Sequence, residues 1–128
     1  MELRQSKVAG LALDRIEAAK HAPFVAEYKT RANSFPAMLV QSGLAQAIGF
    51  LRAKAGRREN DLERAYATYL QDLQDVTRAG WAQLAQDPEA FYRDIVSADL
   101  GRYRRLTRAV LDASVWLKSL AQANLKQG

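Results

Sequence analysis

Three arginines near the C-terminus have the residue type and spacing to bind phosphates. Arg104, Arg105 and Arg108 lie in a segment with helical periodicity, and at about 100° per residue they gather on one face. The apolar residues of the segment fall on the opposite face, so the three arginines are expected to be exposed together. A guanidinium offers paired donors to phosphate oxygens, the sequence-independent part of any nucleic acid. The pattern favours a phosphate-binding surface, with an ordinary solvated helix face as the alternative.

A second basic group follows the most apolar part of the chain. Arg52 and Lys54 would lie in the last turn of a helix, where the macrodipole favours cations. Arg57 and Arg58 come just before the next helix and have no such explanation. All four are therefore candidate phosphate-binding residues, together with the three arginines described above.

No set of residues favours catalysis. The chain has no Cys and one His, so a zinc cluster, a Cys nucleophile and a multi-His metal site are excluded. His21 suits a helix C-terminus, and the carboxylates have capping or surface roles. Tyr66, Tyr69 and Tyr103 fall on apolar stripes, which favours a core role over base stacking. We expect a protein that is not an enzyme and that needs no metal or cofactor.

Charge is unevenly distributed along the 128 residues. Residues 1–56 carry 8 basic against 4 acidic side chains, residues 57–100 carry 5 against 9, and residues 101–128 carry 6 against 1. The segments have net charges of +4, −4 and +5, which favours binding to a polyanion, a complementary partner or head-to-tail contact between copies, with chance segregation on a solvated surface as the alternative. The N-terminus shows no signal-peptide pattern, so we expect a cytoplasmic protein.

The elements that must position these side chains are helices. Apolar residues recur at three- and four-residue spacings and no alternating β-branched run occurs, which predicts an all-α fold. We expect one compact domain, residues 1–128, with about six helices and a long C-terminal helix. Pro23, Pro36 and Pro88 are each expected near a helix start, where the missing N–H costs least. The expected helices are residues 2–21, 24–32, 35–56, 60–80, 87–97 and 99–126.

The segment from Phe35 to Leu51 is apolar on nearly every side of a helical wheel, which predicts a central helix enclosed by its neighbours. It is too short and too polar for a bilayer span. Gly43 and Ala47 are expected to let another backbone approach closely. In the last helix, Leu111, Val115 and Trp116 extend the apolar surface around the helix, which favours a partner interface there.

Two stretches carry a family resemblance. The first runs from Tyr28-Lys29 through Pro36 into Gly43, Leu44, Gln46 and Ala47, and ends with Phe50-Leu51. The second contains Tyr103-Arg104, Thr107 and Trp116-Leu117-Lys118. Together they resemble the small all-helical subunit of the type III-B CRISPR RNA-guided effector complex, the small protein of the Cmr module. The chain departs from the family's pattern at Arg108-Ala109 and at Ser119-Leu120.

The resemblance implies a non-catalytic subunit of this ribonucleoprotein in antiviral defence. Its copies would stack head to tail as an inner filament beside the backbone subunits and the large subunit. They would flank the guide–target duplex and help to hold the target RNA. We interpret the motif residues as mainly structural: Pro36, Gly43, Leu44, Gln46, Phe50, Trp116 and Lys118.

Two other function classes remain open. The last two predicted helices could form a helix-turn-helix that binds duplex DNA, although the final helix is longer than groove reading requires. A helical adaptor that binds only protein, through Leu111, Val115 and Trp116, is the other alternative.

Overall fold

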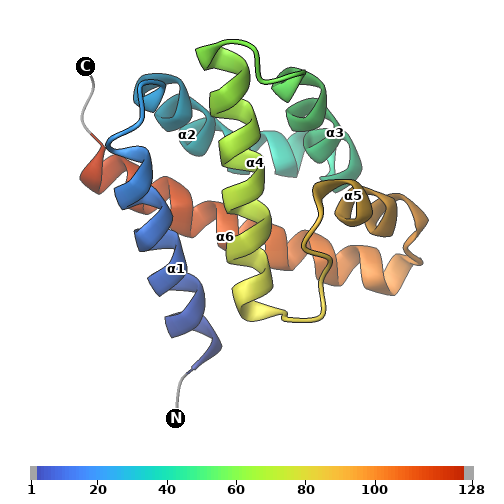
Figure 1. Cartoon of the computed structure of the whole chain (residues 1–128). Coiled ribbons are helices and arrows are strands. Elements are labelled where there is room, and N and C mark those ends of the chain that lie inside the picture. The colour runs from blue at the N-terminus through green and yellow to red at the C-terminus, as the bar shows by residue number, and fades with distance from the viewer. Residues whose placement is uncertain (1–2, 126–128) are drawn as a thin grey trace.

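The structure is a computed structural model, and it describes residues 3–125. Over these residues the chain forms six helices and no strand, so the predicted all-α class is confirmed (Figure 1). No helix in this span is both long enough and apolar enough to cross a bilayer. Glu2 and Lys126, two of the predicted helix limits, lie outside the described residues. The helices are α1 (Arg4–Ala19), α2 (Val25–Ser42), α3 (Leu44–Ala55), α4 (Asp61–Gly80), α5 (Pro88–Ser97) and α6 (Leu100–Asn124).

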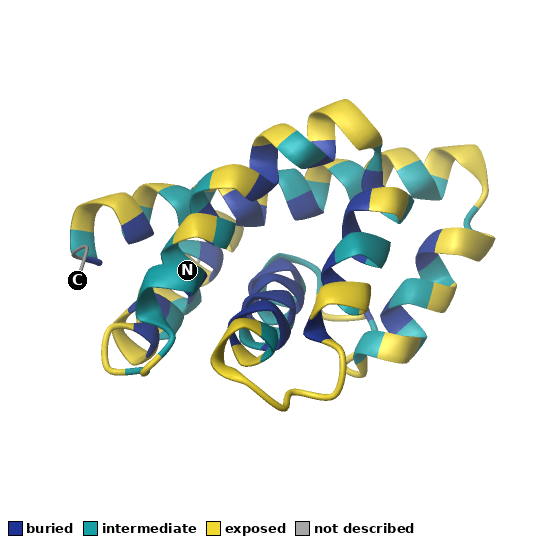
Figure 2. Ribbon diagram, turned by 90° about the horizontal axis from the view of Figure 1, so that it is seen from above, coloured by how far each residue is buried: buried dark blue, intermediate teal, exposed yellow. Residues whose placement is uncertain are grey.

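The central helix is α4, which packs against each of the other five helices. Seen along its axis, α4 lies among its neighbours and is mostly buried (Figure 2). In α4, Tyr66, Tyr69, Leu73 and Val76 form a buried stripe, whereas Leu62, in the first turn, is 51% exposed. The prediction that the Phe35–Leu51 segment is the enclosed central helix is wrong, since Val40 within it is 71% exposed.

The same segment is also not one helix. Helix α2 continues through Asn33, Ser34 and Pro36, where a new helix was expected to begin. Pro36 only removes one hydrogen bond and is itself buried, so packing of this part of α2 outweighs the local cost. The Ser34 hydroxyl donates to the Thr30 carbonyl at 2.9 Å, inside the helix, and caps nothing.

The break between α2 and α3 lies at Gly43, whose backbone has φ 87° and ψ 161°. Side chains strongly disfavour this conformation, so glycine sets the break. The Gly43 N–H donates to the Leu39 carbonyl, and its own carbonyl accepts from Ala47 N–H at 3.0 Å. Gly43 therefore ends α2 and begins α3. This differs from the predicted role, in which Gly43 lets a neighbouring backbone approach closely. Ala47 is fully buried in α3.

Helices α4, α5 and α6 begin where local capping predicts. The side chains of Asn60, Asp87 and Asp99 each accept a hydrogen bond from the N–H three residues on, at 2.8–3.0 Å. Glu63 accepts from the N–H of Glu59, so a capping box forms at the start of α4 with its return bond on the residue before the N-cap. The predicted starts of these helices are confirmed.

A partly buried polar network joins α1, α2 and α4. Arg15 donates to Asp72 at 3.0 Å and to Asp75 at 2.7 Å, and the Tyr28 hydroxyl donates to Asp72 at 2.7 Å. Burial raises the pKa of Asp72, and the bonds from Tyr28 and Arg15 offset only part of that effect. Burial would lower the pKa of Arg15, but its two carboxylate partners outweigh burial and raise it. The network fixes how α1 and α2 sit on α4.

Candidate nucleic-acid interface

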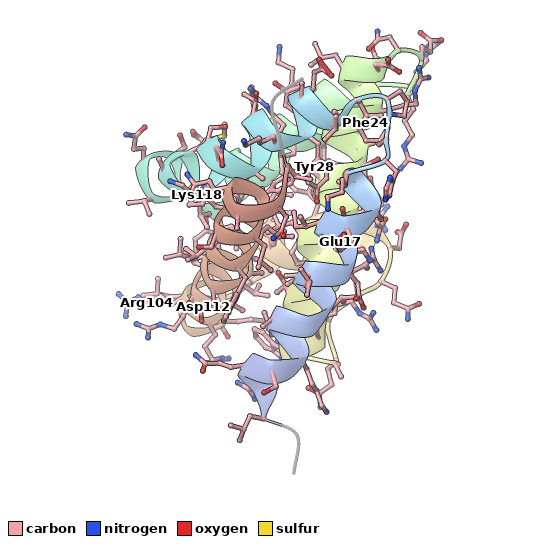
Figure 3. All side chains as sticks on the ribbon, turned by 90° about the vertical axis from the view of Figure 1, so that its left-hand side faces the viewer. Glu17, Phe24, Tyr28, Arg104, Asp112 and Lys118 are labelled. Carbon is pink, nitrogen blue, oxygen red and sulfur yellow. The ribbon has the colours of Figure 1, made fainter. Side chains whose placement is uncertain are left out.

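The three arginines of α6 are exposed, as periodicity predicts. Arg104, Arg105 and Arg108 point away from the buried stripe of Leu106, Val110, Ala113 and Leu117. Figure 3 shows Arg104 extending from α6 on the side away from α1. Within residues 3–125, no ion pair joins any of the three to a carboxylate. Their charges are therefore available to an anionic ligand.

Two other cations that look equivalent in the sequence are already engaged. Arg102, beside the cluster, donates to both carboxylate oxygens of Asp94, at 2.8 and 2.6 Å, and links α5 to α6. Arg52, one of the predicted phosphate contacts, pairs with Glu89 of α5 and lies 4.3 Å from the centre of the Tyr92 ring. Arg52 holds α5 against α3. Because Glu89 partly neutralises the Arg52 guanidinium, Arg52 attracts RNA phosphates less than an unpaired arginine would.

The other members of the second basic group lie at the end of α3 and in the turn after it. Lys54, Arg57 and Arg58 are exposed, and Arg58 has a positive φ of 59°, which turns the chain toward α4. This turn and the first half of α6 lie on different parts of the molecule (Figure 1). The fold therefore presents two separate basic surfaces.

Two residues that sequence reasoning did not assign lie beside the α6 cluster. Arg4 of α1 and Trp81, which follows α4, line one pocket together with Arg105 and Arg108. Periodicity within one helix cannot reveal this grouping, because it joins three separate elements.

The family-motif residues serve mainly the fold. Leu44 is fully buried, and Phe50 packs edge-on against Tyr66 with ring centres 5.8 Å apart. Gln46 is exposed, and Lys118 is half-buried on α6 (Figure 3). The predicted partner-interface residues differ in exposure: Val115 is 47% exposed, whereas Leu111 and Trp116 are half-buried against the core.

The described residues contain no group of three or more His, Asp or Glu side chains placed to hold a metal ion. His21 is exposed in the turn after α1, and its backbone N–H donates to the Ala18 carbonyl at 3.3 Å. The helix-end role of the His21 side chain stays a prediction.

Comparisons with known proteins agree with the fold over its whole length. The family model for CRISPR-associated proteins of the Cmr5 type matches residues 4–124. A Thermus thermophilus protein described as CRISPR system Cmr subunit Cmr5 is 30% identical over 127 residues, which cover 99% of this chain and 100% of the relative. An X-ray structure of a CRISPR-associated Cmr5 family protein from Thermus thermophilus matches with a TM-score of 0.83 and 28% identity. That match covers 98% of this chain and 100% of the other. This chain therefore belongs to the Cmr5 family of CRISPR-associated proteins.

Proposed function

We propose that this chain is a non-catalytic small subunit of a type III-B CRISPR effector complex and contacts target RNA or the guide–target duplex through its basic surfaces. Family membership supports the assignment to the complex, since the Thermus relative is described as a Cmr subunit. The observation that carries the RNA contact is the exposed set of Arg104, Arg105 and Arg108, which has no carboxylate partner within residues 3–125.

Binding of this kind is electrostatic and independent of sequence. Arginines that neutralise phosphates release counterions, so affinity falls as salt rises. The exposed Lys54, Arg57 and Arg58 would form a second contact, with Arg52 contributing least because Glu89 compensates it. A subunit that holds RNA along its backbone needs no base-specific contact for this function.

The charge distribution supports head-to-tail stacking of copies. In such stacking, a surface of one copy meets a different surface of the next. The acidic segment 57–100 lies between basic segments in the sequence, so contact between the acidic segment of one copy and a basic segment of the next would be attractive. The exposed Val115, beside Leu111 and Trp116, offers an apolar contact for the backbone or large subunits.

The test is the salt dependence of RNA retention by the assembled complex. In the triple variant Arg104→Ala, Arg105→Ala, Arg108→Ala, we expect weaker binding and a slope of log affinity against log salt that is shallower by about 2, since each lost phosphate contact contributes about 0.7. The matched control is Lys20→Ala, Arg64→Ala, Arg93→Ala. It removes the same charge from exposed side chains that each have a carboxylate neighbour.

An unchanged slope in the α6 triple variant would exclude these arginines from the RNA surface. Sequence-selective binding of duplex DNA by the isolated chain would favour a helix-turn-helix function instead. Retention of the partner subunits after nuclease treatment, without any crosslink to RNA, would favour a protein-only adaptor.

A further inference from the structure

A pocket of about 450 Å³ opens between the N-terminal half of α1, the C-terminal end of α4 and the face of α6 that carries Arg105 and Arg108. The start of α1 and the end of α4 lie at the same end of the molecule, and α6 crosses behind both helices (Figure 1). Val8 and Val76 line the inner, apolar part of the pocket. Its volume falls within the range of about 300–1,000 Å³ typical of sites for small organic ligands.

The polar lining of this pocket is mainly cationic. Arg4, Arg105 and Arg108 surround it, against one carboxylate, Asp112. None of these four side chains has an ion-pair or hydrogen-bond partner within residues 3–125, whereas the nearby Arg102 is held by Asp94. The excess of positive charge therefore selects an anionic ligand.

Trp81 adds an aromatic wall, and its position is held from one side. The Arg102 guanidinium lies 5.2 Å from the centre of the Trp81 ring and is itself fixed by Asp94. Trp81 is half-buried, so part of the indole stays accessible at the pocket. Gly80 lets α1 approach the end of α4, since a Cβ there would lie 3.0 Å from Val8 Cγ2. The pocket is thus lined by an aromatic side chain and by three arginines, whose guanidinium groups can bind phosphates.

We propose that this pocket holds one base of a single-stranded RNA against Trp81, with the flanking phosphates on Arg4, Arg105 and Arg108. The inference rests on the proposed RNA-binding function and goes further, because it assigns a base-binding site rather than a backbone contact alone. Bases splayed from single-stranded RNA stack on aromatic side chains and present their hydrogen-bonding edges to the protein. A carboxylate accepts from the exocyclic amine of cytosine, which uracil lacks. As the one carboxylate of the lining, Asp112 is expected to favour cytosine over uracil.

The test uses the intact chain with Trp116→Phe, which leaves Trp81 as the sole tryptophan of the two in the sequence. Short cytidine and uridine homopolymers are titrated at low salt while the Trp81 fluorescence is followed. We expect the cytidine oligomer to quench the fluorescence and to bind more tightly than the uridine oligomer. Asp112→Asn should reduce that preference.

Binding is then measured by anisotropy with a dye-labelled cytidine oligomer. Trp81→Leu should weaken binding about tenfold, in line with the effect of removing one stacked base. Trp81→Phe should restore most of the affinity. Arg104→Ala is the matched control, because Arg104 lies on the same helix but outside the pocket. It should weaken both oligomers equally and leave the quenching at saturation intact. Circular dichroism confirms that each variant is folded.

The outcomes separate this inference from the function on which it rests. In one outcome, Arg104→Ala weakens RNA binding, RNA does not change the Trp81 fluorescence, and Trp81→Leu and Trp81→Phe bind RNA as tightly as the parent chain. The base site is then wrong and the RNA-binding function stands. If no oligomer binds at low salt, the base site is wrong, and RNA retention by the assembled complex decides the RNA-binding function separately. If Trp81 substitution releases partner subunits while RNA affinity is unchanged, the pocket receives a protein side chain, and the base site is again rejected.

Discussion

The hydroxyl of Tyr103, on α6, accepts a hydrogen bond at 2.9 Å from the backbone N–H of Ala45, the second residue of α3. The first N–H groups of a helix have no partner within the helix. Gly43, the N-cap residue of α3, has no side chain to supply one. Tyr103 therefore caps α3 from a helix 58 residues away in sequence.

Tyr103→Phe should lower the free energy of unfolding by about 1 kcal/mol, the typical value of a helix cap. The ring keeps its packing, so the loss comes from the unpaired Ala45 N–H. Urea unfolding followed by circular dichroism measures it. Tyr92→Phe is the matched control, because no hydrogen bond involves the Tyr92 hydroxyl within the described residues. Equal midpoints for Tyr103→Phe and the parent protein would contradict the capping role.

Gly43→Ala should destabilise the fold by about 1–2 kcal/mol, because alanine is strained at a positive φ. Space is not the limit, since a Cβ at Gly43 would lie 3.6 Å from the Tyr103 hydroxyl. Gly10→Ala, in the exposed middle of α1 with no atom within 4 Å of the new Cβ, should stabilise by up to about 1 kcal/mol. Thermal melts of the two variants should therefore shift in opposite directions. A gain in stability on Gly43→Ala would rule out strain at this joint.

Arg15→Met should destabilise by about 2 kcal/mol, because Asp72 loses its cation while 6% exposed. This loss of unfolding free energy is small for a broken ion pair because 33% of the Arg15 side chain is exposed to solvent. The pKa of Asp72 is already raised by burial, and losing Arg15 raises it further, so protonation stabilises this variant.

The difference in unfolding free energy between Arg15→Met and the parent should thus become smaller as the pH falls from neutral. Urea titrations at several pH values measure this difference. Arg15→Met combined with Asp72→Asn should recover part of the loss, since no charge then lacks a partner. A deficit independent of pH would contradict the assignment to Asp72.

Asp94→Asn should lower the free energy of unfolding by about 1 kcal/mol at neutral pH. The value is small because the Asp94–Arg102 pair is partly exposed to solvent. The hydrogen bonds from Arg102 lower the pKa of Asp94, and burial offsets only part of this. A carboxylate with a lowered folded-state pKa stabilises fully above its unfolded value, about 3.9, and loses that contribution as the pH falls through the folded value. The difference between parent and variant should therefore shrink below about pH 3.9.

The starts of the last three helices could be predicted because capping is local. Asn60, Asp87 and Asp99 each need only the N–H three residues on. The boundary between α2 and α3 could not, because Pro36 and Gly43 both favour an interruption and only packing decides between them. Nor could the sequence identify α4 as the central helix, since its neighbours come from both ends of the chain.

In the candidate site, too, features set by the local sequence could be predicted and features set by tertiary packing could not. Periodicity within α6 predicts the exposure of Arg104, Arg105 and Arg108. The pairing of Arg52 with Glu89 spans 37 residues and follows from the docking of α5, so nothing near Arg52 indicates it. Arg4 and Trp81 join the arginines of α6 only once three elements are folded together.

Four consecutive residues of α6 face different surroundings. Arg102 binds Asp94, Tyr103 caps α3, and Arg104 and Arg105 face outward, with Arg105 at the pocket. One extra residue inserted before Arg102 would turn the rest of the helix by about 100° relative to its start and misplace all of these groups at once. Length changes in homologous genes should therefore spare this part of α6 and accumulate in the connections at residues 57–59 and 82–86.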